Sequence, residues 1–305
     1  RIYIMPATKF ICPDKEEIPI GNCLAHCRMA SRCLTLPTLI TIASSERPWE
    51  GKTSTTRLLN GTMLEYLKVV SEYAIDPKSR AYSLLGTSHH NQLAQVEGDW
   101  ISEVRVSDDA GGPSGQPDLL EPDESNPGSY LLTDYKTFGS YRVMKLLGLV
   151  KETKDHPTEV YFKSGRWGKA GSPKKMTVFH QDPTKVEMEN EALQLNHYRL
   201  LLQKRGYTIS GMQLQITVRD GGLQVARERG VTESIYLVPI PKLDDDTLEQ
   251  FFAQKHKALL KAVETNTMPE PCTESESWNH RRCKEYCEVS KFCPQGQRVA
   301  ITGGS

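Results

Sequence analysis

Eight cysteines, placed in two groups with the same spacing, constrain this chain of 305 residues more than any other feature. Each group reads C-x10-C-x3-C-x5-C, and chance duplication of three successive spacings is improbable. Each group is therefore expected to fold as a local unit. The first group comprises Cys12, Cys23, Cys27 and Cys33, and the second comprises Cys272, Cys283, Cys287 and Cys293.

The two middle cysteines of each group stand at positions i and i+4, which places both thiols on one side of a helical turn. Four thiols gathered in this way suit a tetrahedral Zn²⁺ or an iron-sulfur cube, and disulfides are a further use. An intracellular setting disfavours disulfides. We expect two local four-cysteine zinc sites, with a [4Fe-4S] cluster, held at one end or shared, as the alternative. A closed thiolate site holds its segment together and leaves no open position for chemistry.

A second constraint lies at residues 114–138, which read SGQPDLLEPDESNPGSYLLTDYKTF. Two short apolar runs flank a turn rich in Pro, Asp, Ser, Asn and Gly, a pattern typical of a β-hairpin. Alternate side chains of a strand share a face, so Asp134 and Lys136 point the same way and Tyr135 points the other way. If the strands pair with Asp118 beside Asp134, two carboxylates and an ammonium converge. Such oxygen ligands suit Mg²⁺ or Mn²⁺.

Three short motifs occur in an order that resembles the RecB-like branch of the PD-(D/E)XK nuclease superfamily. They are similar to its G-x-x-x-H motif, its PD…DxK core and its Q-x-x-x-Y helix, and the resemblance covers about residues 57–240. Some members join their termini with a [4Fe-4S] cluster on one upstream and three downstream cysteines, whereas this chain has four at each end. The matching positions are Gly86 and His90, Pro117 and Asp118, Asp134 to Lys136, and Gln194 and Tyr198.

The resemblance implies a restriction-endonuclease-like α/β core, with a central mixed sheet flanked by helices. It also implies a metal-dependent deoxyribonuclease, usually an exonuclease on DNA ends in repair or recombination. The alternative is a zinc-stabilised DNA-binding or scaffolding module whose nuclease core is inactive. DNA ends or single strands are the expected partners, together with recombination or replication proteins. The cofactors expected are Mg²⁺ or Mn²⁺ at the active site and two Zn²⁺, or [4Fe-4S], at the cysteines.

The resemblance also implies roles for individual residues. Carboxylates hold one or two divalent ions that polarise the scissile phosphate and activate a water. Lys136 orients or deprotonates that water, or stabilises charge on the phosphate. For His90, a solvent-exposed histidine is the alternative. The expected catalytic residues are His90, Asp118, Asp134, Lys136, Gln194 and Tyr198, and the expected metal ligands are His90, Asp118, Asp134 and the main-chain carbonyl of Tyr135.

Hydrophobic periodicity predicts the remaining elements. The clean alternation of residues 100–106 predicts the first strand of the sheet, with Glu103 at an exposed position. The helix at 81–97 is expected to bury Tyr82, Leu85, Leu93 and Val96. Further helices are predicted at 58–73, 141–150, 186–205 and 246–263, and further strands at 213–218 and 234–239.

The segment 151–185 carries eight Lys or Arg against four Asp or Glu, a net charge of +4. Aromatic residues are interleaved with these charges. Cations that hold phosphates beside rings that stack on bases are typical of a single-strand contact surface. The alternative is a solvated β-hairpin whose rings pack on the domain. The predicted DNA-binding residues are Lys163, Arg166, Trp167, Lys169, Lys174 and Lys175.

With 38 basic and 38 acidic residues the chain has no global positive field, so any DNA affinity must come from a local patch. No apolar run approaches membrane-spanning length, and the start of the chain lacks the apolar stretch of a signal peptide. We expect an intracellular protein, cytoplasmic or nucleoid-associated, with no membrane partner. The G-K-T-S tetrad at 51–54 is not a phosphate-binding loop, because Glu46 replaces the first glycine of that motif.

These features predict three parts. Residues 1–45 form an N-terminal four-cysteine metal-binding segment. Residues 46–265 form the nuclease core, with a basic insertion at 151–185. Residues 266–305 form a C-terminal four-cysteine metal-binding segment.

Overall fold

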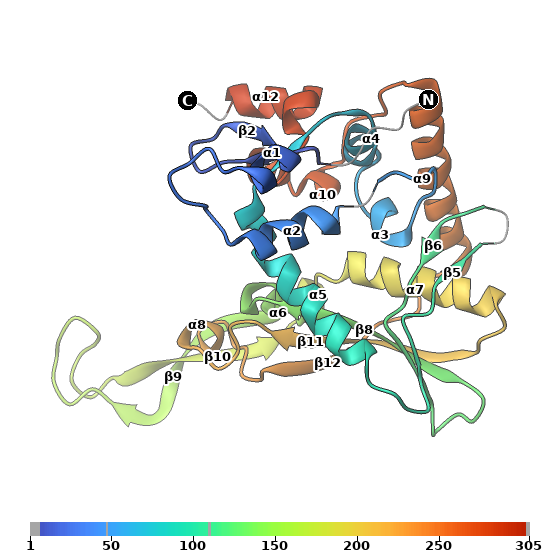
Figure 1. The fold of residues 1–305 in the computed structure, drawn as a ribbon. Helices are drawn as coiled ribbons and strands as arrows, with labels where there is room; N and C mark the ends of the chain where they lie inside the picture. The colour runs from blue at the N-terminus through green and yellow to red at the C-terminus, as the bar shows by residue number, and fades with distance from the viewer. Residues whose placement is uncertain (1–6, 47, 109–110, 303–305) are drawn as a thin grey trace.

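The computed structural model describes residues 7–46, 48–108 and 111–302. Helices lie over a five-stranded sheet of order β12-β11-β8-β7-β4 (Figure 1). The central pair β8 and β11 is parallel and the other pairs are antiparallel. The predicted mixed sheet flanked by helices is confirmed. Its strands are β4 (Ile101–Ser102), β7 (Leu119–Pro122), β8 (Tyr130–Phe138), β11 (Ile209–Val218) and β12 (Ile235–Pro239).

The lower core lies between this sheet and the helices α6 (Ser140–Leu146) and α7 (Glu189–Lys204). Every second residue of β11 from Met212 to Val218 is buried, because alternate side chains of a strand share a face. Apolar residues of α7 pack on that face, which fixes the helix over the centre of the sheet. The fully buried members include Leu120, Leu132, Leu195, Leu202, Leu214 and Ile216.

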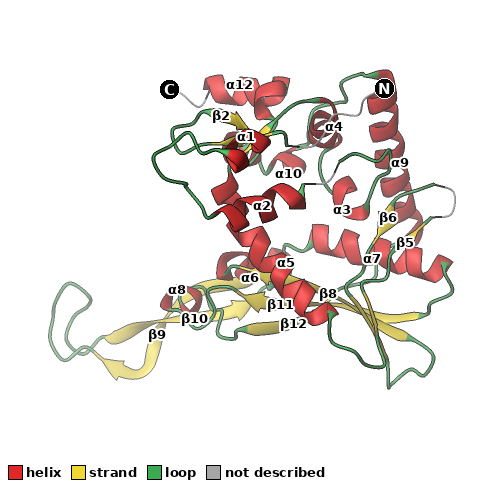
Figure 2. Ribbon diagram, in the orientation of Figure 1, coloured by secondary structure: helices red, strands yellow, loops and turns green. Residues whose placement is uncertain are grey.

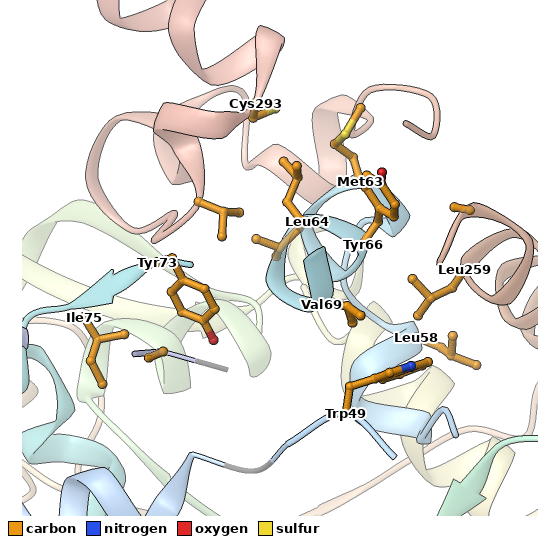
Figure 3. Packing of buried hydrophobic residues seen from close by; sticks show 14 of the residues in the cluster. Trp49, Leu58, Met63, Leu64, Tyr66, Val69, Tyr73, Ile75, Leu259 and Cys293 are labelled. Atoms are coloured by element: carbon orange, nitrogen blue, oxygen red, sulfur yellow. The ribbon is translucent and has the colours of Figure 1, made fainter. Parts of the chain in front are cut away.

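An upper core surrounds α4 (Thr62–Val70) and α9 (Asp245–Thr265). In Figure 3, Trp49, Leu64 and Cys293 are among the side chains that gather around α4. Cys23 and Cys293 are both buried in this cluster, so both cysteine-bearing segments pack against the central helices. The three predicted parts thus share a core, and their boundaries stay a prediction. The terminal segments contain β1 (Lys9–Ile11), β2 (Glu17–Pro19), α1 (Ile20–Ala25), α2 (Leu36–Ser45), α10 (Glu274–Ser277), α11 (Arg281–Glu285) and α12 (Pro294–Thr302).

The basic segment forms a long antiparallel hairpin of β9 (Leu149–Val160) and β10 (Pro173–Gln181), which we call the arm. Figure 2 shows the arm extending away from the sheet and the helices.

Among the described residues, no helix is long and apolar enough to cross a bilayer. The remaining short elements are α3 (Thr55–Leu58), β3 (Ala74–Ile75), α5 (Ala81–Ala94), β5 (Val106–Ser107), β6 (Ser114–Gly115), α8 (Gln224–Arg227) and three 3-10 turns, at Pro77–Arg80, Pro183–Lys185 and Ser290–Phe292.

Several predicted elements are wrong in extent. The strand predicted at 100–106 pairs with β7 only at Ile101 and Ser102, because Glu103 adopts a positive φ of 52° that ends it. The helix predicted at 58–73 is two helices, α3 and α4, and that predicted at 141–150 ends at Leu146. The helices at 81–97, 186–205 and 246–263 and the strands at 213–218 and 234–239 are confirmed with shifted ends.

The predicted apolar side of α5 is also wrong. Tyr82, Leu85 and Val96 are exposed, whereas Leu84 packs against the upper core. The Arg219 guanidinium lies 4.1 Å from the centre of the Tyr82 ring, which partly covers it. The helix turns its histidines toward β8 instead, and that orientation leaves most of its apolar residues in solvent.

Stability should depend on pH through His197, which is buried in α7. Its Nδ1 lies 2.8 Å from the Thr55 hydroxyl and its ring stacks on Phe252 with centroids 3.8 Å apart. Burial lowers the pKa of His197 to about 3. Below an unfolded-state pKa of about 6.5, the unfolded chain binds a proton that the folded chain excludes, so this residue costs up to about 1.4 kcal/mol per pH unit as the pH falls toward 3.

Denaturant unfolding at pH 7, 6, 5 and 4 measures this effect. We expect the free energy of unfolding to fall less steeply with acid in His197→Gln than in the native chain, because glutamine does not titrate. The comparison uses slopes, so an overall destabilisation of the variant does not affect it. Equal slopes in the two proteins would contradict the assignment.

Candidate active site

The β7–β8 hairpin brings Asp118 and Asp134 together. The register pairs Leu119 with Thr133, so Asp118, immediately before β7, lies beside Asp134 on β8. Asp118 Oδ2 accepts a hydrogen bond of 2.7 Å from the backbone N–H of Tyr135. Both carboxylates are buried, Asp118 with 8% and Asp134 with 2% of its surface exposed. The predicted pairing is present, and it places both acids at one point on the sheet.

Asp134 and Lys136 face α7, and a network of polar side chains joins them to it. The Lys136 ammonium forms an ion pair with Asp134 and donates to Gln194 Oε1 at 3.2 Å. The Gln194 amide donates to Asp134 Oδ1 at 3.2 Å and to the Tyr198 hydroxyl at 3.1 Å. Gln194 and Tyr198, one helical turn apart, share a face as their spacing predicts. The network holds the carboxylate and the ammonium in fixed orientations.

Tyr135 points to the opposite side, toward α5. Its ring meets those of His89 and His90 edge-on, with centroids 6.1 Å and 6.0 Å apart. The close approach of α5 to β8 is helped by Gly86, where a Cβ would lie 3.3 Å from the Thr137 hydroxyl. The alternation predicted for the D-Y-K triplet is therefore confirmed. A ligand role for the Tyr135 main-chain carbonyl stays a prediction.

Burial shapes the electrostatics of this pair. Burial raises the pKa of Asp134 to about 6, the Lys136 ammonium opposes the rise, and the charge of Asp118 adds to it. Burial lowers the pKa of Lys136, but the charges of Asp134 and Asp118 outweigh burial and the pKa ends above its ordinary value. Despite the ion pair, Asp134 Oδ2 accepts no hydrogen bond of standard geometry within the described part of the chain. A buried carboxylate oxygen that accepts no such hydrogen bond can serve as a ligand for a cation.

His90, Glu103 and Asp118 form a second arrangement on the α5 side. His90 Nδ1 lies 3.2 Å from Asp118 Oδ1, and one ligand atom from each of the three residues lies within 4.8 Å of the others. Among the described residues, no other group of three or more His, Cys, Asp or Glu side chains meets that distance. The hydrogen bond that Asp118 accepts from the imidazole raises the pKa of His90. His90 is therefore a partly buried partner of Asp118 and not a solvent-exposed histidine.

The prediction for Glu103 is wrong. The residue is half-buried, its backbone N–H donates to the Asp118 carbonyl at 3.1 Å, and its side chain accepts from Gln116. Its left-handed backbone turns the carboxylate toward the hairpin, and the apolar alternation of 100–106 hides that turn. A non-glycine residue held in this conformation is often part of a functional site. No pattern in the sequence signals the conformation of Glu103.

Asp118 connects the two arrangements. One of its oxygens is beside His90, and the other accepts from the strand that carries Asp134 and Lys136. Carboxylates with one imidazole form a donor set that suits Mn²⁺ or Mg²⁺. The residues present therefore fit a hard divalent cation.

None of the eight cysteines, all of which lie in the described part of the chain, forms a disulfide. No three sulfur atoms of the described chain lie within 4.8 Å of one another, so the four-cysteine metal sites stay a prediction. The prediction that each middle pair shares a helical turn is wrong. Cys23 lies in α1 and Cys283 in α11, whereas Cys27 and Cys287 lie just beyond the ends of those helices. The two groups nevertheless share part of their local structure: the second cysteine lies in a short helix, the third lies just beyond its end, and another helix begins soon after the fourth.

The four C-terminal cysteines line one small cavity of about 20 Å³ against α4. Burial raises the pKa of Cys272 to about 11, a backbone hydrogen bond at Leu64 opposes the rise, and Cys293 and Cys287 add to it. Gly61 permits this approach, because a Cβ there would collide with the sulfur of Cys272. In the N-terminal group, burial and then the charges of Cys12, Cys27 and Cys33 raise the pKa of Cys23. Cys272 and Cys23 thus each interact with other thiols of their own group.

The tip of the arm is exposed. Phe162 has 90% and Trp167 has 77% of its surface in solvent, so their rings do not pack on the domain. Lys163, Arg166 and Lys169 have no acidic partner within the described part of the chain, and the Arg166 guanidinium lies 5.4 Å from the Trp167 ring centre. Of the other predicted contacts, Lys174 pairs with Glu159 and Lys175 with Asp155. DNA binding by the six residues stays a prediction.

Comparisons with known proteins add little. No protein-family model matches the chain, and no curated protein matches it. A solved structure described as "Crystal structure of SSO0001" is similar with a TM-score of 0.40 and 13% identity, over 84% of this chain and 93% of that chain. That likeness is too slight to assign a family.

Proposed function

We propose that this protein is a divalent-metal-dependent deoxyribonuclease that hydrolyses phosphodiester bonds from DNA ends. The observation that carries the proposal is the meeting of Asp118, Asp134 and Lys136 at one buried point of the sheet, with His90 on one side and Gln194 on the other. Each of these positions belongs to a motif that resembles the RecB-like nucleases. Their convergence is what a shared active site requires.

The residues divide into ligands and positioning groups. His90, Glu103, Asp118 and Asp134 would hold Mg²⁺ or Mn²⁺, which when bound polarises a phosphate and lowers the pKa of a coordinated water. The Lys136 ammonium would donate a hydrogen bond to a phosphate oxygen, and this bond would strengthen as negative charge builds on that oxygen in the transition state. Gln194 would hold the side chains of Asp134 and Lys136 in place through the hydrogen bonds described above.

Cleavage assays test the proposal. Linear and covalently closed circular DNA, single- and double-stranded and labelled at either end, would be incubated with Mg²⁺, Mn²⁺ or EDTA. We expect release of short products from linear DNA with either metal, and none in EDTA. Nicking of closed circles would overturn the exonuclease assignment. DNA binding without cleavage in any metal would indicate an inactive binding module.

Replacing Glu103 with Gln should weaken Mn²⁺ binding by about tenfold or more, because an amide replaces a charged ligand. Titration calorimetry with Mn²⁺ alone, without DNA, measures this change. Glu121→Gln is the matched control, since it removes the same charge from an exposed position on β7, the strand that pairs with β4. If both variants bind Mn²⁺ as tightly as the native chain, Glu103 is not a ligand.

Replacing Trp167 with Ala should weaken single-stranded DNA binding by about 5- to 150-fold, the equivalent of about 1–3 kcal/mol per stacked base. Fluorescence anisotropy without added Mg²⁺ or Mn²⁺, which prevents cleavage and leaves structural zinc in place, measures the affinity. Lys175→Ala is the comparison within the arm, and we expect a smaller loss because this lysine already pairs with Asp155. An unchanged affinity in Trp167→Ala would show that the arm does not stack on bases.

A further inference from the structure

A polar cavity of about 290 Å³ lies beside the candidate active site. Its charged lining consists of Lys52, Arg57 and Arg105 against Glu50, so three positive charges minus one negative charge leave +2. The hydroxyl groups of Ser54, Thr56 and Ser114 add neutral donors. Cations and hydroxyl groups in this combination recognise anions, and phosphate above all.

The cavity shares two walls with the active site. Gln116 lines it and donates to Glu103, and the chain continues directly into Asp118. Tyr198 lines it as well, and its hydroxyl accepts from Gln194, the residue that holds Asp134 and Lys136. One layer of side chains therefore separates the cavity from the candidate metal ligands. A phosphate bound in the cavity could therefore belong to the same strand as a phosphodiester bond placed at those ligands, and could lie close to that bond along the strand.

Arg57 is held in position before any ligand arrives. Its Nε lies 3.2 Å from the carboxylate of Glu65, and its guanidinium lies 4.8 Å from the centre of the Trp49 ring. Glu65 is buried and also accepts from Asn60, so the anchor is rigid. Glu65 is thus a buried structural partner of Arg57. A cation fixed in this way loses little conformational entropy when it binds an anion.

Lys52 and Arg105 are exposed at the mouth of the cavity and have no acidic partner within the described part of the chain. Lys52 belongs to the tetrad at 51–54, which lacks the spacing of a phosphate-binding loop. The tetrad nonetheless contributes its lysine and hydroxyl groups to this cavity. Its chemistry suits phosphate although its local fold differs from that motif.

We propose that this cavity binds the terminal phosphate of a DNA strand while the neighbouring phosphodiester lies at the candidate metal ligands. The inference rests on the proposed nuclease function and names the part of the substrate that is recognised. A terminal phosphate carries up to two negative charges, whereas a phosphate within the strand carries one and continues on both sides. The net charge of +2 and the size of the cavity, near the lower limit of about 300 Å³ for small-molecule sites, suit a terminal group.

Binding measurements without cleavage test this inference separately from the nuclease activity. Three single-stranded oligonucleotides of one sequence, with a 5′-phosphate, a 3′-phosphate or neither, would be titrated without added Mg²⁺ or Mn²⁺ and without a chelator, which would remove structural zinc. We expect one phosphorylated form to bind about tenfold tighter than the unphosphorylated form, as one charged hydrogen-bonded contact provides. Its identity gives the polarity of the enzyme. Equal affinities for all three would overturn the inference, whatever the result of the cleavage assay.

Two variants locate the effect. Lys52→Gln and Arg105→Gln change exposed side chains, so the fold should persist, and together they should abolish the preference for the phosphorylated strand. Lys78→Gln removes an exposed cation outside the cavity and should keep the preference. If the double variant retains the preference, or loses affinity equally for all three strands, the cavity does not recognise the terminal phosphate.

Discussion

Asp118→Asn will lower the rate of DNA cleavage by about a hundredfold or more, because it removes a charge from the residue that connects the two halves of the site. Asn has the shape of Asp and keeps an oxygen that can accept the Tyr135 N–H, so the hairpin should remain folded. Single-turnover cleavage of end-labelled DNA measures the rate, and circular dichroism checks the fold. Lys136→Ala should be as damaging, because it removes the ammonium beside Asp134.

The control for Asp118→Asn is Glu124→Gln, which neutralises an exposed acid in the turn of the same hairpin. Glu124→Gln should cleave at the native rate. Metal-dependent cleavage at the native rate in both Asp118→Asn and Lys136→Ala would refute the assignment of the site. If a variant loses both activity and folded structure, the Mn²⁺ titration of Glu103→Gln decides instead whether this site binds metal.

The second large effect concerns the C-terminal cysteines. Cys287→Ser should remove metal from one of two sites and lower the melting temperature by about 10 °C or more, because structural zinc contributes strongly to folding. Elemental analysis measures the metal, and calorimetry measures the melting temperature. Cys27→Ser, the corresponding change in the N-terminal group, should also remove one equivalent of metal. It should lower the melting temperature less than Cys287→Ser does, because the C-terminal cysteines line a cavity against α4.

Visible absorption separates the two metals. A colourless protein with two equivalents of zinc supports local zinc sites, and a brown protein with iron indicates a [4Fe-4S] cluster. Native metal content in both cysteine variants would refute the four-cysteine sites.

Local patterns predicted the parts of the site that depend on local geometry. Strand alternation predicted that Asp134 and Lys136 share a face, and helical spacing predicted the same for Gln194 and Tyr198. The turn pattern predicted a hairpin at 114–138, and the register that places Asp118 beside Asp134, which the sequence left as a condition, comes from the pairing of Leu119 with Thr133. The resemblance implied a central mixed sheet flanked by helices, and the structure has such a sheet of five strands, to which β9 and β10 do not belong.

The remaining parts depend on backbone conformation and tertiary packing. Glu103 reaches the site through a single left-handed residue, which its neighbours do not signal. The exposed side of α5 is decided by what packs against that helix, and periodicity alone cannot tell a core from a solvent-facing apolar side. The polar cavity combines residues from three distant segments, around Lys52, Ser114 and Tyr198, and no motif spans such distances.

The upper core also bears on how the chain folds during synthesis. It contains Phe10 and Val289, so it can close only after residues up to Val289 have left the ribosome. The sheet that carries the candidate carboxylates is complete once β12 ends at Pro239. A nascent chain can therefore build the sheet that carries the candidate site first, while the apolar surface of α4 is still uncovered. Truncated products would expose that apolar surface and become substrates for chaperones and proteases.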